Sequence, residues 1–146
     1  MDWELSFAIA GQAAAVGWLI LIVAPRRWAL LIAVPRLVLP GALSLGYAVL
    51  ILVHFADAGG GFGSLAQVKV LMGSDPVLLA GWVHYLAFDL FVGGWIACRS
   101  DRLGISRLVQ APILLATFLF GPIGLLCHLA LEAGLKALRP VQHAEA

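Results

Sequence analysis

Four apolar runs, each about as long as a bilayer-spanning helix, constrain what this chain can fold into. A helix needs about 20 mostly apolar residues to cross the hydrocarbon of a bilayer. The sequence is 62% hydrophobic and only 12% charged, whereas about 25% of the residues in soluble domains are charged. We therefore expect an all-α integral membrane protein, a four-helix bundle that forms one transmembrane domain over residues 1–146. The expected spans are Trp3–Val23, Leu37–Ala56, Pro76–Cys98 and Leu108–Leu131.

The positions of the basic residues predict how the bundle sits in the membrane. Cytoplasmic loops carry an excess of Lys and Arg, and the loops between the first two and the last two spans hold six of the nine basic residues. With these loops in the cytoplasm, both termini lie outside it. No transit or signal peptide pattern opens the chain, so we expect a bacterial inner (plasma) membrane. The run Trp28–Val34 is too short to span and predicts an interfacial loop or half-turn. We expect the remaining three basic residues, Lys69, Lys136 and Arg139, to lie on the other side of the membrane.

A carboxylate near the middle of the third span is the sharpest functional signal. A charged group at the bilayer centre costs a few kcal/mol on insertion scales, so Asp89 needs a partner, a proton or a function. It is either a proton donor or acceptor in an apolar pocket, or a protonated side chain that hydrogen-bonds neighbouring helices. His84 suits acid–base chemistry, but five residues place it about 140° from Asp89 around the helix. We therefore expect Asp89 to pair with the fourth span rather than with His84.

Small and polar residues form an inward-facing stripe on each span, as is typical of helix–helix contacts in membranes. The fourth span carries Thr117, Gly121, Gly124, His128 and Glu132 at helical spacing. We expect His128 and Glu132 to lie near the outer mouth of a semi-polar interior that opens outward. The proline after Gly121 frees the carbonyl of the residue four positions earlier, and therefore predicts a kink beside a pocket at the depth of Asp89.

The residues that line this expected interior are candidates for contact with a lipophilic ligand. They are Trp82, Tyr85, Phe88, Ser44, Tyr47, Thr117 and Gly124. His54, His84 and His128 lie on three spans at unequal depths, which is a weak pattern for a metal or haem site. We expect no metal and no cofactor.

Two blocks of the sequence resemble a known family. The first is Trp82-x-His84 followed by Asp89-Leu90-Phe91, and the second is Gly121-Pro122-Ile123-Gly124 followed by His128. They are similar to the abscisic-acid-deficient-four-like family, membrane proteins required for neoxanthin synthesis in plants. The resemblance implies a four-helix membrane protein related to the conversion of violaxanthin to neoxanthin, a reaction that opens an epoxide and forms an allene. It also implies catalytic roles for Asp89 and His84 in proton transfer, with His128 assisting.

The preferred prediction is a carotenoid isomerase-like membrane enzyme, or a binding protein, whose partner is a carotenoid, an isoprenoid or a membrane lipid. The alternative is a non-catalytic membrane scaffold or lipid-binding protein, in which the polar residues only hold the helices together. The net charge of +1 gives no basic surface for nucleic acid, so we expect no nucleic-acid partner.

Overall fold

The structure is a computed structural model that describes residues 2–138, and these residues form helices joined by short loops, with no strand. Three helical segments are long and apolar enough to cross a membrane: Trp3–Val23, Ala29–His54 and Asp75–Arg102. The elements are α1 (Trp3–Val23), α2 (Ala29–Ala33), the π-helix η1 (Val34–Val38), α3 (Leu39–His54), α4 (Leu65–Leu71), α5 (Asp75–Arg102), α6 (Arg107–Phe120) and α7 (Pro122–Leu138).

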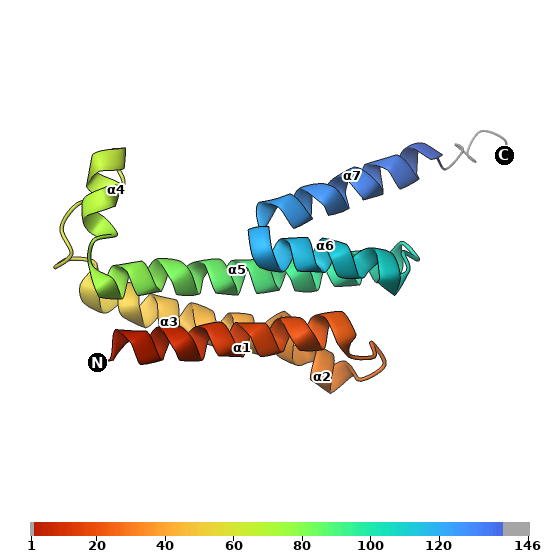
Figure 1. Cartoon of the computed structure of the whole chain (residues 1–146), viewed down its shortest axis with the longest axis horizontal. Helices are drawn as coiled ribbons and strands as arrows, with labels where there is room; N and C mark the ends of the chain where they lie inside the picture. Colours follow the sequence, from red (N-terminus) through yellow and green to blue (C-terminus); the bar gives the residue numbers. More distant parts are fainter. Residues whose placement is uncertain (1, 139–146) are drawn as a thin grey trace, which may run out of the picture.

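Helix α5 lies at the centre of the molecule, with α1 and α3 on one side and α6 and α7 on the other (Figure 1). Its buried face supplies Val83, Ala87 and Leu90 to two apolar clusters shared with the neighbouring helices. Gly93 allows close approach at one crossing, because a Cβ there would overlap the indole ring of Trp18. Large apolar side chains cover the outer surface, which fits a protein surrounded by lipid.

The second helical segment begins earlier than the sequence predicts, because the stretch expected to be an interfacial loop or half-turn over Trp28–Val34 is helical from Ala29 onward. Residues Ala29–His54 form one continuous helical segment that passes through Pro35. A proline inside an α-helix lacks a donor and crowds the preceding turn. The chain accommodates it by widening into the π-helix, where the Leu39 amide donates to the Val34 carbonyl five residues back.

The fourth span is not a single helix, so the predicted crossing over Leu108–Leu131 is wrong. Helix α6 ends at Phe120, the backbone turns at Gly121 with φ of 38°, and α7 runs back along α6 (Figure 1). A positive φ is readily available only to glycine, and the proline that follows is well suited to the first position of the next helix. With 14 residues, α6 is about 21 Å long, shorter than the ~30 Å hydrocarbon core. The four-helix bundle becomes three spans and a half-crossing hairpin.

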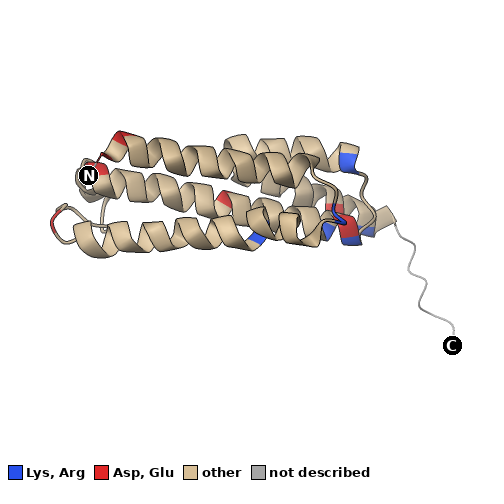
Figure 2. Ribbon diagram, turned by 90° about the horizontal axis from the view of Figure 1, so that it is seen from below, with Lys and Arg blue, Asp and Glu red and all other residues tan. Residues whose placement is uncertain are grey.

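This reversal changes which side the last helix reaches. The end of α7 lies away from the N-terminus (Figure 1), and Glu132 on α7 pairs with Arg99 near the end of α5. The start of α1 and the end of α7 thus lie at opposite ends of the molecule, which does not support the prediction of both termini on one side. His128 and Glu132 lie at the basic end rather than at the expected outer mouth. Lys136 also joins the end of the bundle where most Lys and Arg residues gather (Figure 2). Arg139 lies outside the described residues.

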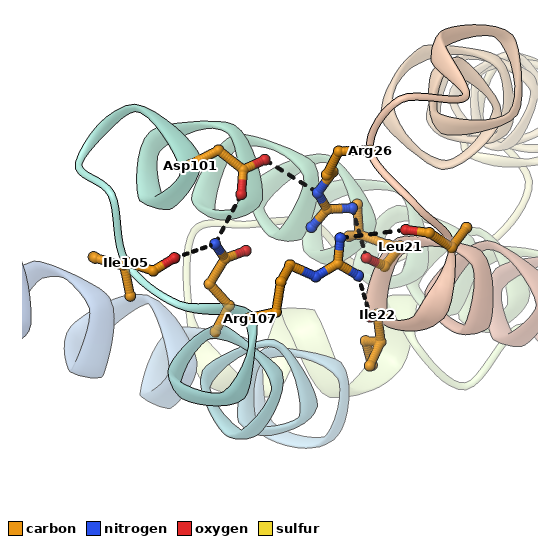
Figure 3. A network of polar contacts seen from close by, with 8 residues as sticks. Leu21, Ile22, Arg26, Asp101, Ile105 and Arg107 are labelled. Carbon is orange, nitrogen blue, oxygen red and sulfur yellow. Dashed lines mark hydrogen bonds and ion pairs between the residues drawn. The ribbon is translucent and has the colours of Figure 1, made fainter.

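A polar network holds this basic end together (Figure 3). Arg26 donates from Nε to Asp101 at 3.1 Å, and Gln110 donates to the other Asp101 oxygen at 2.8 Å. The guanidinium groups of Arg26 and Arg107 donate to carbonyls that α1 leaves without helical partners. These carbonyls belong to Leu21, Ile22 and Ala24. The network ties the end of α1 to the end of α5 and the start of α6, and so fixes where the hairpin begins.

Candidate functional site

The tip of the α6–α7 hairpin lies directly against the carboxylate of Asp89. A Cβ built on Gly121 would lie 2.6 and 2.7 Å from the two Asp89 oxygens, so only glycine leaves room for this contact. Asp89 is half-buried, and its Oδ2 atom is enclosed without a hydrogen-bond partner among residues 2–138. The carboxylate stands beside the first turn of α7, where the helix dipole favours negative charge. Asp89 thus lies against the fourth segment rather than against His84, as expected from the sequence.

Tyr85 lies one helical turn from Asp89 and contacts the α6 side of the hairpin tip. Its hydroxyl donates to the carbonyl oxygens of Phe118 and Leu119, at 3.3 and 3.5 Å. These carbonyls lie in the last turn of α6, where no amide follows to satisfy them. The sequence predicted that Phe118 would need a partner, and Tyr85 provides it. Tyr85 and Asp89 therefore face the two helix ends that meet at the turn.

An aromatic track leads from this site toward the N-terminal end of the bundle. The ring of Tyr85 lies 5.4 Å from that of Trp82, and Trp82 lies 5.1 Å from Phe7. Trp82 and Phe7 also line a cleft of 660 Å³ that opens at this end, between α1 and α5. Because the hairpin reaches only the middle of α5 (Figure 1), the outer part of that side of α5 stays uncovered. The remaining lining residues are Asp2, Trp3, Glu4, Asp75, Leu78 and Leu79.

His84 lies on the α3 side of α5, away from this site. Its ring stacks on Phe88 at 4.5 Å and lies 5.3 Å from the ring of Tyr47. Phe88 and Ser44 line a separate groove of 360 Å³ between α3 and α5. The large angle between His84 and Asp89 expected from helix geometry is therefore found, and these two residues form no dyad.

His128 lies in a third location, at the basic end of the bundle. Its side chain is fully buried, with Nδ1 3.3 Å from the Ser100 hydroxyl and the ring 5.4 Å from that of Trp95. Ser100 is eleven residues beyond Asp89 on α5, which corresponds to about 16 Å along the helix. The structure thus places the three predicted catalytic residues in three separate environments.

The predicted ligand-contacting residues divide in the same way. Trp82 and Tyr85 lie with Asp89, whereas Phe88, Ser44 and Tyr47 lie on the α3 side. Thr117 and Gly124 are buried against each other inside the hairpin, where the Thr117 hydroxyl donates to the Ile113 carbonyl at 2.8 Å. Within residues 2–138, no three His, Cys, Asp or Glu side chains gather as a metal site would require.

Sequence reasoning missed the reversal at the hairpin tip, although a local signal for it exists. Gly121-Pro122 joins a residue that tolerates a positive φ to one that starts a helix well, and Gly-Pro marks a turn more often than a kink. A hydropathy window passes over this dipeptide because apolar residues flank it on both sides. The paired roles of Tyr85 and Asp89 follow only once the turn is known.

Three apolar spans and a half-crossing hairpin whose tip meets a carboxylate define a multi-pass helical membrane protein with a polar site inside its apolar interior. A family model described as ABA DEFICIENT 4-like (ABA4-like) matches residues 5–128, so the chain belongs to this family. The match begins in the first turn of α1, includes the hairpin tip and ends at His128. No curated protein and no solved structure matches the chain.

Proposed function

We propose that this protein binds a carotenoid or a related isoprenoid beside the hairpin tip, and that Asp89 exchanges protons with it. The contact between the Asp89 carboxylate and Gly121 carries the proposal, because it holds an ionisable group at the foot of an apolar, aromatic path. Membership of the ABA DEFICIENT 4-like family supports a role related to neoxanthin synthesis. A long, flat polyene suits the surface offered by Phe7, Trp82 and Tyr85, since aromatic rings stack on extended π-systems.

The proposed chemistry is an isomerisation of the epoxide-opening type. One proton is delivered to the epoxide oxygen and one is removed from a vinylic carbon, so substrate and product contain the same atoms and no oxidant or reductant is needed. Asp89 in its protonated form would supply the first proton, and its carboxylate form would accept the second. Tyr85 lies one helical turn from Asp89, and its hydroxyl would orient the oxygen by donating to it in place of the α6 carbonyls.

One observation favours the alternative of a non-catalytic lipid-binding protein or scaffold. Asp89, His84 and His128 do not converge, and both His128 and Thr117 lie fully buried within helix contacts. Under this alternative the cleft lined by Phe7 and Trp82 would hold a lipid without changing it.

Pigment analysis in a carotenoid-producing bacterium separates these functions. The full chain is expressed as wild type and as Asp89→Asn, which keeps the size of the side chain but cannot carry a proton between two sites. Asp57→Asn, in an exposed loop, is the matched control. We expect wild type and Asp57→Asn to produce a new xanthophyll isomer, and Asp89→Asn to reduce its yield by at least about 100-fold, within the 10²–10⁴ range of acid–base catalysis.

Each other result has a defined meaning. Pigment that co-purifies unchanged with all three proteins supports the lipid-binding alternative and contradicts proton transfer. A wild-type protein that changes no pigment and retains none contradicts the whole proposal.

A further inference from the structure

Arg36 is an arginine inside an apolar span, and no acidic side chain within residues 2–138 pairs with it. A Cβ on Gly94 would lie 3.4 Å from the Arg36 Cα and 3.1 Å from its Cγ, so Arg36 packs beside α5 at this level. Gly94 is eight residues from the end of α5, which places Arg36 about 12 Å inside the basic end. An unpaired ionisable residue at such a position is costly and marks a functional site by default.

The π-helix explains why Arg36 faces α5. Pro35 and the wide turn of η1 offset the helix at this point, and π-turns of this kind occur frequently at functional sites. Gly94 on α5 provides the matching space, because any larger residue would press on the Arg36 stem. Two independent sequence features thus hold the stem of Arg36 against α5.

Arg36 joins two cavities of opposite character into one groove between η1, α3 and α5. Toward the basic end, a cavity of 180 Å³ is lined by Arg36, Arg99 and Arg102 together with Trp95 and Cys98. Toward the middle of the membrane, a cavity of 360 Å³ has apolar walls. Arg36, Leu37 and Phe91 line both. The apolar walls are Pro40, Gly41, Ala87 and Phe88, with Ser44 as the one hydroxyl.

We propose that this groove binds one anionic phospholipid from the leaflet at the basic end, with its phosphate on Arg36 and Arg102 and one acyl chain along the apolar walls. Arg99 lines the groove but is paired with Glu132, so it does not supply a free charge. The charges are complementary, since guanidinium groups bind phosphate oxygens in a fork geometry. Ala87 and Arg102 are separated by about 22 Å along α5, which is half of the ~40–45 Å thickness of a bilayer with its headgroups. The groove is therefore as long as one leaflet.

The groove also opens sideways to the lipid. Leu37 is 66% exposed and Phe91 is 53% exposed, so an acyl chain can enter from the membrane without any helix moving. This site is separate from Asp89, which faces the hairpin on another side of α5. The proposal does not depend on the proposed function.

Native mass spectrometry of the full chain tests the proposal. The protein is taken from nanodiscs that hold phosphatidylglycerol and phosphatidylcholine with identical acyl chains, and the retained lipids are counted. We expect wild type to retain one phosphatidylglycerol in preference to phosphatidylcholine, and Arg36→Gln to bind it about tenfold more weakly, as loss of a charged hydrogen bond predicts. Arg27→Gln, an exposed arginine outside the groove, is the matched control and should bind like wild type.

Arg102→Gln keeps the test decisive if Arg36→Gln does not fold, because Arg102 is exposed and changing it leaves the packing intact. It should weaken phosphatidylglycerol binding several-fold. Equal retention of the two lipids, equal binding by Arg102→Gln and Arg27→Gln, or displacement of the lipid by inorganic phosphate alone would each overturn the proposal.

Discussion

Gly121 meets two constraints that no other residue type satisfies together. Its φ of 38° lies in the region that L side chains rarely adopt, and a Cβ would press on both oxygens of Asp89. The residue therefore sets the turn of the hairpin and the position of the carboxylate at once. Tyr85 gives the turn a second hold through the α6 carbonyls, so the site is built from backbone requirements as much as from side-chain chemistry.

We predict that Gly121→Ala lowers the free energy of unfolding by about 1–3 kcal/mol, the cost of a residue held in a disfavoured backbone region. Denaturant unfolding in neutral detergent measures this change. The control is Gly134→Ala on α7, where a Cβ meets nothing within 4 Å and alanine favours the helix. If both variants unfold at the same denaturant concentration, the turn at Gly121 does not constrain the fold.

Among the elements, α7 approaches α5 closely at few points, and a polar attachment joins the two helices. Arg99 donates to both oxygens of Glu132, and Lys136 lies 2.7 Å from one of them. Hydrogen bonds from Arg99 and then from Lys136 lower the pKa of the Glu132 carboxyl to about 2. The basic end of the hairpin is thereby fixed while its tip is held by Tyr85.

This attachment gives the protein a specific pH dependence. The folded-state pKa of Glu132 lies below its ordinary value of 4.5, so its stabilising effect is complete above pH 4.5 and is lost as the pH falls toward 2. We predict that wild type is more stable than Glu132→Gln at pH 7 and that this difference shrinks through that window. Unfolding midpoints from pH 7 to pH 2 measure it. Glu4→Gln, exposed in the first turn of α1, should keep the wild-type pH profile.

The elements also show how far sequence reasoning reaches. Helix α1 begins and ends at the predicted residues because a continuous apolar run with an Asp2 N-cap leaves no alternative. The stripe of Thr117, Gly124, His128 and Glu132 is buried as predicted, although it belongs to two helices. Spacing reports which face is buried, but it does not report whether the helix continues. That depends on the Gly121 backbone, which hydropathy does not sense.

Part of the candidate site could likewise be predicted from the sequence, and part could not. The pairing of Asp89 with the fourth segment follows from depth and helix geometry, which are properties of one chain segment at a time. The positions of His128 and Arg36 depend instead on the reversal at Gly121 and on the π-turn at Pro35. Each of these two backbone features changes the position of all the residues that follow it in the chain. A prediction that misses the feature therefore places those residues at the wrong end of the bundle or on the wrong face of a helix.

For the molecule as a whole, the hairpin predicts the topology. With three helices long enough to span, we predict that the start of α1 and the end of α7, which lie at opposite ends of the molecule (Figure 1), are on opposite sides of the membrane. The hairpin also moves Lys136 to the side of the arginine-rich loops, where it strengthens the excess of positive charge. From the positive-inside rule we predict that this side is cytoplasmic. Among residues 2–138, Lys69 on α4 is the Lys or Arg at the opposite end of the molecule.

Single-cysteine labelling tests this topology. In a Cys98→Ser, Cys127→Ser background, we predict that Lys136→Cys and Arg27→Cys react with a membrane-impermeant thiol reagent from the same side, and Ser64→Cys from the other. Arg27 and Ser64 are exposed in the loops at opposite ends of the second span, so they report the two sides whatever α7 does. A continuous helix through Gly121 would instead bring Lys136→Cys to the side of Ser64→Cys. That result would remove the hairpin, and with it the contact that holds Asp89.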